Sequence, residues 1–506
     1  MRPLIHEIQT AHTPESLAAQ LLALDARFGR APSQLMLLRT LVFDSPVARY
    51  SYLVARPLLT FRSFGSRCEI ARPQTPGAVE QVQFGNPWRL LDVLMSRFEL
   101  LDEIDSPFPL GGAFGYWGYD LKNFTEPKLS RRAVNDLELP DCHVGFYDSL
   151  VVFDHRLDKV IVISAGMNPD GSRSELRAAA QLAFWKDQLS KPLRTGETHP
   201  TRGVAAPVQP AAEVASHLSR AGFVSAVQRA QRYIRAGDIY QVNLAQRLTT
   251  PSVLDGWEMF QRLAAVSPAP FAAYLDCRAA SGPQFEIASS SPEQFLRISG
   301  AQIVTRPIKG TRPRAADPTR DAQLAYELQT SAKELAELVM ITDLLRNDLG
   351  RICEYGSVQT PELARLERFA QVQHLVATVE GRLRGDLTHF AAFAACFPGG
   401  SITGAPKFRA QQIIDELEPV ARGPYCGAIG YLGFNRESQL NIAIRTAICQ
   451  AGQPSQPGAV HFSVGAGIVA DSDPDAEFDE TLAKARGFCR ALAFPLHSAK
   501  TMKPDG

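Results

Sequence analysis

Strand-like segments separated by short turns constrain the fold of this 506-residue chain more than any other pattern. Residues 145–153 and 159–164 are rich in β-branched, aromatic and aliphatic side chains, and the segment Asp-His-Arg-Leu-Asp between them is typical of a turn. The pair therefore predicts a β-hairpin. Residues 35–42 and 50–55 have a similar composition. Strands joined by hairpins favour an antiparallel or mixed sheet over a doubly wound parallel sheet.

Composition along the chain predicts two regions. In the first, residues 1–190, apolar periodicity predicts three helices, at 16–28, 88–98 and 174–189. Residues 191–216 contain four prolines with threonine, glycine and alanine between them, which predicts a linker. The second region is expected to span residues 217–497, followed by a flexible tail at 498–506.

The second region again mixes helices and strands. Apolar residues recur at helical spacing between Phe223 and Ile234, and the helix is expected to stop at Gly237. Residues 321–350 have a further helical pattern. Four strands are predicted between these helices, at 239–248, 271–275, 285–288 and 295–298.

Charge and cysteine content exclude several classes of protein. The chain has 53 basic and 53 acidic side chains, so its net charge gives no reason to expect a nucleic-acid or membrane-surface partner. The first residues lack the apolar run of a signal peptide, and no apolar stretch reaches the ~18 residues of a membrane span. The eight cysteines are scattered without a Cys-x-x-Cys pair, as in a reducing compartment. We therefore expect a cytoplasmic protein of enzyme size.

Lys309 lies on a turn whose backbone is tightly constrained. Pro307 fixes φ before it and Gly310 permits unusual φ after it. An amine held in this way can serve as a point charge or as a nucleophile, although most lysines at turns are merely solvated. Glu293 precedes Lys309 by one predicted hairpin, so the two side chains are expected to share a pocket. One would act as nucleophile and the other as general acid and base.

Two pairs of glutamates have the same helical spacing. Glu334 and Glu337 are three residues apart in one predicted helix, and Glu477 and Glu480 repeat this spacing in another. One such pair is more often a solvated acidic patch. Two pairs supply the oxygen ligands that a hard divalent cation prefers, with water and substrate completing its coordination.

Two glycine-rich segments and several polar residues in apolar surroundings suggest a site for an anion. The segment Thr403-Gly404-Ala405-Pro406-Lys407 leads into a predicted helix whose N-terminus would favour negative charge, although it is not a P-loop and could be structural. Arg445 lies within an apolar strand-like segment and requires a partner, which a carboxylate ligand would supply. Tyr425 and His374 are polar residues of apolar stretches, and each alone is more often a satisfied core residue.

Together these segments resemble the chorismate-utilising enzyme family, which contains the large components of anthranilate synthase and aminodeoxychorismate synthase as well as isochorismate and salicylate synthases. The resemblance is dense from residue 221 to 492 and looser before it. Its specific segments are AGDIYQVNLAQR, SPEQF, PIKGTRPR, AELVMITDLLRNDLGRI, PGGSITGAPK, GAIGYLGF and GAGIVADSDPDAEFDET.

The resemblance implies an α+β fold in which large, mostly antiparallel β-sheets pack together with helices on the outside, as in anthranilate synthase component I. Lys309 discriminates within the family, since anthranilate synthases usually have Pro-Ile-Ala-Gly-Thr where aminodeoxychorismate synthases have Pro-Ile-Lys-Gly-Thr. The lysine thus favours the aminodeoxychorismate synthase branch. Gln241 occupies the stretch where the isochorismate and salicylate enzymes place a lysine that activates water, which disfavours water as the nucleophile.

The implied reaction is a transfer of ammonia to chorismate, giving 4-amino-4-deoxychorismate, a precursor of p-aminobenzoate and folate. By resemblance, Lys309 attacks ring carbon 2 as the 4-hydroxyl leaves, and ammonia then adds at carbon 4 and expels the lysine. Glu293 would protonate the departing hydroxyl. Mg²⁺ is expected on Glu337 and Glu480, with Glu334 and Glu477 nearby or bound through water. The remaining substrate contacts are expected from Arg445, Tyr425, Lys407, Thr403, Gly404, Ala405, His374, Gly465 and Ala466.

The resemblance also implies partners. No Cys stands in the Gly-x-Cys-x-Gly setting of a glutaminase, so ammonia is expected from solution or from a separate glutamine amidotransferase subunit. In this family the N-terminal region often holds a tryptophan pocket, and residues 49–52 lie where it would begin. Two alternatives remain: an anthranilate synthase component I that carries the lysine, and a non-catalytic relative that only binds ligand.

Overall fold

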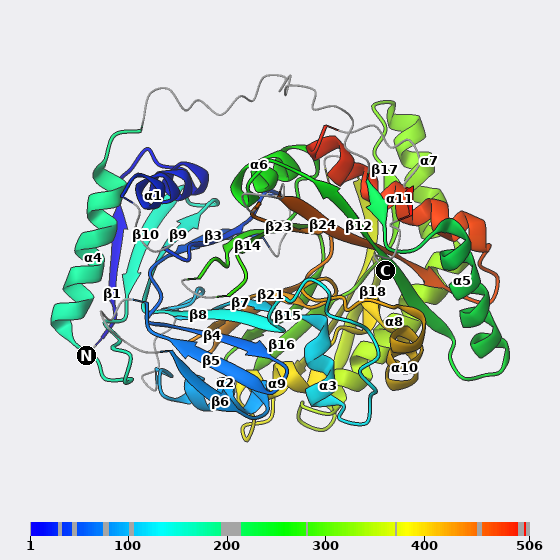
Figure 1. Cartoon of the computed structure of the whole chain (residues 1–506), viewed down its shortest axis with the longest axis horizontal. Coiled ribbons are helices and arrows are strands. Elements are labelled where there is room, and N and C mark those ends of the chain that lie inside the picture. The colour runs from blue at the N-terminus through cyan, green and yellow to red at the C-terminus, as the bar shows by residue number, and fades with distance from the viewer. Residues whose placement is uncertain are drawn as a thin grey trace.

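The computed structural model describes residues 2–28, 33–42, 48–73, 80–100, 106–193, 214–279, 282–369, 372–452, 458–493 and 500–501. Two large β-sheets dominate it, and helices surround them (Figure 1). In the part described, every strand pair is antiparallel except the short β11–β25 pair. This arrangement confirms the prediction of large, mostly antiparallel sheets with helices outside.

The first sheet contains thirteen strands in the order β1-β10-β9-β3-β2-β13-β14-β23-β24-β12-β11-β25, with β20 beside β12. Their bounds are β1 (Leu4–Ile8), β2 (Met36–Arg39), β3 (Tyr50–Val54), β9 (Ser149–Asp154), β10 (Lys159–Ser164), β11 (Ala215–Ser216), β12 (Gln241–Pro251), β13 (Phe271–Asp276), β14 (Phe285–Ser291), β20 (Gly404–Ala405), β23 (Thr446–Gln450), β24 (Ala459–Ile468) and β25 (Lys500–Thr501).

The second sheet contains twelve strands in the order β17-β19-β16-β15-β22-β21-β7-β8-β4-β5-β6, with β18 beside β19. Their bounds are β4 (Leu59–Phe64), β5 (Arg67–Ala71), β6 (Gln81–Phe84), β7 (Gly112–Trp117), β8 (Cys142–Tyr147), β15 (Gln294–Ser299), β16 (Gln302–Arg306), β17 (Ile308–Pro313), β18 (Gln359–Arg368), β19 (Val372–Arg382), β21 (Ala428–Gly433) and β22 (Glu437–Ile442).

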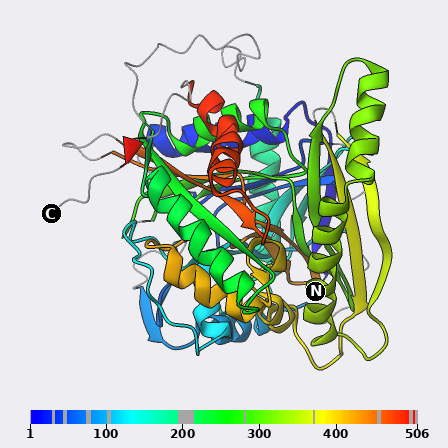
Figure 2. The same ribbon diagram turned by 90° about the vertical axis from the view of Figure 1, so that its right-hand side faces the viewer.

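Helices cover the outside of the two sheets, with α1 and α4 at one end and α5, α7, α8, α10 and α11 at the other (Figure 1). Helices α5 and α11 lie side by side (Figure 2). The helix bounds are α1 (Pro14–Phe28), α2 (Pro87–Ser96), α3 (Lys122–Thr125), α4 (Glu175–Ser190), α5 (Arg220–Arg235), α6 (Gly256–Val266), α7 (Pro318–Gln329), α8 (Ala332–Gly350), α9 (His389–Cys396), α10 (Lys407–Leu417) and α11 (Pro474–Ala491), with 3₁₀ turns η1 (Tyr119–Leu121) and η2 (Gly400–Ile402).

The predicted hairpin is confirmed by β9 and β10, but residues 145–153 are not one strand. The chain leaves the second sheet at the end of β8 and enters the first sheet with β9. Asp148 lies at the crossing, is 1% exposed and pairs with Arg177 of α4 at 2.8 Å. Burial raises the pKa of Asp148, and the arginine compensates part of this cost. The run of apolar residues is the same on both sides of the crossing, so the sequence pattern does not reveal it.

The predicted helix over residues 321–350 is two helices, α7 and α8. The backbone breaks at Thr330 and Ser331, and the Ser331 side chain accepts a hydrogen bond from the N–H of Glu334. This is a standard N-cap, which supplies a partner for one of the unpaired N–H groups at a helix start. The Ser-x-x-Glu spacing is a signal from which the break could have been predicted.

The regions predicted at 1–190 and 217–497 share both sheets. Strand β2 pairs with β13 in the first sheet, and β7 pairs with β21 in the second. The division is thus one along the chain and not between separate sheets. The linker of 191–216 and the tail of 498–506 lie largely outside the described residues, apart from residues 191–193 and strands β11 and β25, which pair with each other.

The core lies between the two sheets. Its largest hydrophobic cluster joins residues of both, including Tyr52 of β3 and Tyr431 of β21, whose rings meet edge to face at 5.1 Å between centroids. All eight cysteines are buried and free, as predicted from their scattered positions. No helix in the described part of the chain is long and apolar enough to cross a membrane.

Candidate active site

Glu293 and Arg445 lie at two further points where the chain crosses from one sheet to the other. Glu293 stands between β14 of the first sheet and β15 of the second, and Arg445 stands between β22 of the second sheet and β23 of the first. The crossings are joined by backbone hydrogen bonds: the Ile442 N–H donates to the Glu293 carbonyl, and the Ser290 N–H donates to the Arg445 carbonyl. Two functional side chains are therefore fixed to one rigid junction.

Lys309 lies on β17, next to helix α8. Its Nζ is 3.3 Å from Oε2 of Glu337, and its side chain is 18% exposed. Gly310, which follows it, has φ of +68°, and a Cβ there would stand 2.6 Å from Leu328. A residue with a side chain would be strained and crowded at this position, so glycine is required for the lysine to face the site.

Glu293 lies near enough to Lys309 for the charge of the lysine to act on its carboxyl group, and the environment of the acid suits proton transfer. Burial raises the pKa of Glu293 to about 7, although a hydrogen bond from Ser401 and the positive charge of Lys309 favour the carboxylate. A carboxylic acid with this pKa is partly protonated at neutral pH and can give or take a proton. Ser401 was not predicted from the sequence, since a serine in a Gly-rich turn has no distinguishing signal.

Arg445 is a half-buried cation without an acidic partner in the described part of the chain. Its Nη1 is 3.4 Å from Oγ of Ser267, and burial lowers its pKa. The sequence placed this arginine inside a strand, but the structure places it in the break between strands, with φ of +50°. A half-buried guanidinium that lacks a carboxylate is suited to bind one from a ligand.

His374 lies on β19 beside Lys309. Its Nδ1 is 2.9 Å from Oγ1 of Thr311, and it also faces the Gly310 carbonyl at 3.3 Å. Burial lowers the pKa of His374 to about 4, so the imidazole is neutral at neutral pH. The positive charge of Arg445 acts in the same direction, which shows that His374 and the unpaired arginine are neighbours.

The four predicted metal ligands do not form one cluster, and two of them, Glu337 and Glu480, feel the charge of Lys309. Glu337 pairs with Lys309, Glu480 pairs with Lys484 at 2.8 Å, and Glu334 lies 3.5 Å from Arg312. Glu477 accepts a hydrogen bond from Ser472. Within the described residues, no three His, Cys, Asp or Glu side chains stand close enough together to hold a metal ion.

The charges near Glu480 and Glu477 nevertheless affect the pKa values of these two carboxyl groups. Burial raises the pKa of Glu480, but the positive charges of Lys484 and Lys309, among others, outweigh burial and hold it below the usual value. Burial raises the pKa of Glu477, and the charge of Glu480 raises it further. Two carboxylates from different helices suffice for Mg²⁺, which keeps several waters. A Mg²⁺ site on Glu337 and Glu480, with substrate and water as the other ligands, stays a prediction.

The Gly-rich segment differs from its prediction. Gly404 and Ala405 form the short strand β20 beside β12, and α10 begins only at Lys407. The buried Thr403 hydroxyl donates to the carbonyls of Gly399 and Gly400 within its own turn. The segment thus lines the end of β12 and leads through its N-cap Pro406 into α10, so it differs from the prediction only in where the helix begins.

Lys407 is occupied by contacts within the protein. Its Nζ donates to Oδ2 of Asp348 at 2.7 Å and to the Cys396 carbonyl at 2.8 Å. Asp348 is 2% exposed and comes from α8, so the pair joins α8, α9 and α10. The lysine therefore neutralises a buried acid, and no local sequence pattern indicates a partner 59 residues away.

The Gly-rich strand β24 closes the site next to Tyr425 and Gln241. A Cβ on Gly465 would stand 3.0 Å from the Tyr425 hydroxyl, and one on Gly467 would stand 2.5 Å from Nε2 of Gln241 and 3.9 Å from Nζ of Lys309. Ala466 between them pairs with Leu244 of β12. Within the described residues, the Gln241 side-chain oxygen is buried without a hydrogen-bond partner, so it can accept one from a ligand.

Comparison with known proteins identifies the family of this chain. The sequence profile described as chorismate binding enzyme matches residues 39–490. The chain belongs to the chorismate binding enzyme family. The aminodeoxychorismate synthase component 1 of Escherichia coli (strain K12) is 36% identical over 458 residues, which cover 90% of this chain and 93% of that protein. The anthranilate synthase component 1 of Acetivibrio thermocellus is also 36% identical, over 88% of this chain and 87% of that protein.

A solved structure of a relative has the same fold as this chorismate binding enzyme. The crystal structure of anthranilate synthase component I from Streptococcus pneumoniae TIGR4 superposes with a TM-score of 0.72 at 30% identity, covering 88% of this chain and 93% of that one. The predicted anthranilate synthase component I-like fold is thereby confirmed. The aminodeoxychorismate synthase and the anthranilate synthase are equally similar to this chain, so the relatives do not decide which product this chain makes.

Proposed function

We propose that the chain is an aminodeoxychorismate synthase, which converts chorismate and ammonia to 4-amino-4-deoxychorismate for p-aminobenzoate and folate synthesis. The observation that supports this proposal is the amine of Lys309 beside the buried acid Glu293, whose pKa is raised to about 7. A nucleophile and a proton donor in one pocket are what replacement of a hydroxyl through a covalent adduct requires. Anthranilate synthases usually have alanine in place of this lysine.

The proposed reaction proceeds in two displacements. The Lys309 amine bonds to ring carbon 2, the two ring double bonds shift, and the carbon–oxygen bond at carbon 4 breaks. Glu293 gives its proton to the departing hydroxyl, which leaves as water. Ammonia then bonds to carbon 4, the double bonds shift back, and the bond between carbon 2 and Lys309 breaks. Protons lost by the two amines return to Glu293 and to solvent, so the net products are 4-amino-4-deoxychorismate and water.

The other residues would position the two reactants. Arg445 would bind a substrate carboxylate, since it lacks an acidic partner among the described residues. Tyr425, His374 and the β24 and β20 backbones would enclose the ring. The free Gln241 oxygen would accept a hydrogen bond from ammonia, and an amide cannot deprotonate water. When bound by Glu337 and Glu480, Mg²⁺ would neutralise the ring carboxylate of chorismate.

The source of ammonia is part of the proposal. The similar proteins of known function are named as component 1, which implies that they work with a second component. We propose that this chain, in the cytoplasm, receives ammonia from a separate glutamine amidotransferase subunit. Free ammonium at alkaline pH would replace the partner in a purified system.

A second candidate function is anthranilate synthesis. It is favoured by the equal identity of the Acetivibrio thermocellus anthranilate synthase component 1. The two reactions differ in product: anthranilate forms with release of pyruvate, whereas 4-amino-4-deoxychorismate releases pyruvate only after a separate lyase acts.

The deciding experiment is a product assay with purified chain, chorismate, Mg²⁺ and ammonium at alkaline pH, with and without an aminodeoxychorismate lyase. We expect p-aminobenzoate only when the lyase is present. Anthranilate and pyruvate without lyase would establish the second candidate instead. A Lys309→Ala variant that retained full output at low ammonium would remove the covalent role of the lysine while leaving the product unchanged.

A further inference from the structure

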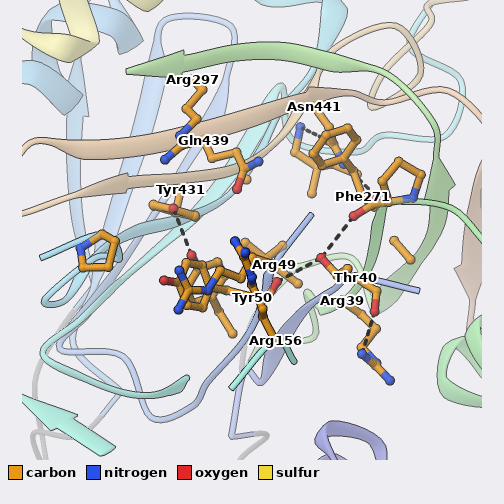
Figure 3. Close-up of a pocket in the computed structure, with 17 residues that line it drawn as sticks. Arg39, Thr40, Arg49, Tyr50, Arg156, Phe271, Arg297, Tyr431, Gln439 and Asn441 are labelled. Carbon is orange, nitrogen blue, oxygen red and sulfur yellow. Dashed lines mark hydrogen bonds between the residues drawn. The ribbon is translucent and has the colours of Figure 1, made fainter. Parts of the chain in front are cut away.

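The interior of the protein is filled unevenly. Strands β3 and β21 leave a cavity of about 250 Å³ between them (Figure 3). Tyr50 and Tyr52 line this cavity, and the family resemblance associates them with a tryptophan pocket, which stays a prediction. Beside the candidate active site, in contrast, a charged side chain fills the interior. It belongs to Arg422, which lies in the loop between α10 and β21 and has 3% of its side chain exposed.

Arg422 is held from one side by an acid and an aromatic ring. Its Nε and Nη2 donate to the two carboxylate oxygens of Glu418 at 2.8 and 2.6 Å, and its guanidinium lies 4.6 Å from the centroid of the Tyr119 ring. Glu418 Oε1 also accepts a hydrogen bond from the Ala245 N–H of β12 at 2.9 Å. The charge of the arginine is therefore satisfied within the protein, so its role is to hold other groups in place.

Two further hydrogen bonds lead from Arg422 to segments of the site. Nη1 donates to the Ile402 carbonyl at 3.0 Å, and Nη2 donates to the Asn243 carbonyl of β12 at 2.8 Å. The Asn243 N–H in turn donates to the Thr403 carbonyl at 2.8 Å. One guanidinium therefore fixes Ile402 directly and Thr403 through Asn243, and it holds this turn against both β12 and the end of α10.

The turn held in this way carries Ser401, whose side chain is hydrogen bonded to Glu293. The Thr403 hydroxyl donates to two carbonyls of the turn itself. Those two bonds shape the turn, but they do not fix its position relative to the neighbouring elements. The bonds from Arg422 do so next to Ser401, because the carbonyl that Nη1 reaches belongs to the following residue.

We propose that Arg422 is a positioning residue for proton transfer, because it holds the turn at the place from which the Ser401 hydroxyl reaches Glu293. Arg422 acts through Ser401 and does not itself touch the reacting atoms. The same guanidinium lies 5.9 Å from the centroid of the Tyr425 ring, so it also supports a residue that is expected to contact the substrate. The inference rests on the proposed role of Glu293 as the proton donor.

An Arg422→Lys variant tests the proposal with the least damage to the fold. Lysine keeps a positive charge beside Glu418, but it lacks the planar set of donors that reaches two carbonyls and a carboxylate at once. Ser401 should then lose its hydrogen bond to Glu293, and this bond favours the charged form of the acid. The basic limb of the kcat/KM profile should therefore move about 0.5 to 1 pH unit higher.

The measurement is the rate of chorismate consumption as a function of pH, which does not depend on the identity of the product. A Ser401→Ala variant should show the same shift, and the double variant of Arg422→Lys with Ser401→Ala should shift no further, because both changes remove one hydrogen bond. An unmoved limb in Arg422→Lys, or shifts that add in the double variant, would overturn the proposal. A parent protein without a basic limb near pH 7 would instead remove the proposed role of Glu293, and the inference with it.

A second variant keeps the test valid if Arg422→Lys does not fold. Arg422→Met combined with Glu418→Gln removes the ion pair as a unit, so no unpaired charge is buried. The glutamine keeps an oxygen for the Ala245 N–H, while the hydrogen bonds to the Ile402 and Asn243 carbonyls are lost. The same shift of the basic limb is expected, and a limb that stayed in place would contradict the proposal.

The matched control is Arg62→Lys on β4. Arg62 forms an ion pair with Glu69 in which both side chains are 6% exposed, close to the burial of the pair between Arg422 and Glu418. In the order of the second sheet, β4 is remote from β17, which carries Lys309. The control should lower the thermal midpoint as Arg422→Lys does but leave the basic limb in place. A control that moved the limb equally would show that general loosening of the fold causes the shift.

Discussion

Glu293 has the burial and the partners that a proton donor needs at neutral pH. Its pKa of about 7 predicts that kcat/KM falls as pH rises through this value, because the protonated acid is lost. A Glu293→Gln variant should lose this basic limb and about 10²- to 10⁴-fold in kcat/KM. The measurement is the pH profile of kcat/KM for chorismate, and an unchanged basic limb in the variant would assign that limb to another group.

Ser401 tunes this acid without reaching the substrate itself. Its hydrogen bond favours the charged carboxylate, so a Ser401→Ala variant should have a Glu293 pKa above that of the parent protein. The basic limb of the profile should then move to higher pH, while activity at low pH is retained. A purely structural role for Ser401 would lower kcat/KM at every pH and leave the limb in place.

At the level of residues, the sequence predicts candidate site residues but not the contacts that their side chains make within the protein. The proximity of Glu293 and Lys309 follows from one hairpin, because β15 and β16 pair directly. The pairing of Lys407 with Asp348 depends on how α8 and α10 pack, which no local pattern records. The free oxygen of Gln241 is likewise visible only once β24 lies against it.

At the level of elements, the glycine at position 467 lets β24 pass close to the side chains of Gln241 and Lys309. A Gly467→Ala variant would place its Cβ 2.5 Å from Nε2 of Gln241, so the amide must move. We expect kcat to fall at least about tenfold, equivalent to about 1.4 kcal/mol in the barrier, with little change in the thermal midpoint. The matched control is Gly350→Ala at the end of α8, where nothing lies within 4 Å and stability should rise by up to about 1 kcal/mol. Equal kcat in the two variants would contradict the close approach at β24.

Helices α8 and α11 each carry a pair of glutamates that we predict to lie at a Mg²⁺ site. If Glu337 and Glu480 bind Mg²⁺ directly, replacing either with glutamine should raise the Mg²⁺ concentration needed for half-maximal chorismate binding by at least about tenfold. Glu334→Gln and Glu477→Gln should have smaller effects, since contact through water is expected there. The measurement is calorimetric titration of chorismate at several Mg²⁺ concentrations, and equal Mg²⁺ dependence in all four variants would exclude the direct roles.

Most of the helices and strands predicted from the sequence are present within a few residues of their predicted bounds, because apolar periodicity reports which face of an element is buried. The sequence did not predict the crossings at Asp148, Glu293 and Arg445. Where the chain passes from one sheet to the other, its alternation of apolar and polar residues continues. The neighbouring strands change at that point, but the sequence pattern does not. Such crossings require knowledge of both sheets, which is a property of the packed molecule.

At the level of the whole molecule, buried neutral histidines predict sensitivity to acid. Burial lowers the pKa of His143 to about 3 and those of His374 and His461 to about 4. In the unfolded chain a histidine binds a proton as pH falls through about 6.5, whereas these remain neutral in the folded protein. The free energy of unfolding should therefore decrease as pH drops below about 6.5.

His143 provides the clearest case, since neither of its ring nitrogens has a hydrogen-bond partner within the described residues. Between pH 7 and pH 5 it should account for a loss of about 2 kcal/mol in the free energy of unfolding. A His143→Leu variant should lose that much less over the same range in urea denaturation. The same substitution at exposed His6 is the control, and an identical pH dependence in the two variants would exclude His143 as the cause.

Because both parts of the chain contribute strands to each sheet, the protein could be cut into two fragments that depend on each other to fold. A break within residues 194–213 would leave every strand described above intact, yet neither fragment would contain all the strands of either sheet. The strands of each fragment would need the strands of the other fragment as hydrogen-bonding partners. Expressed together, the fragments would reassemble as complementary parts of one enzyme, whereas each made alone would expose unpaired strand edges and aggregate.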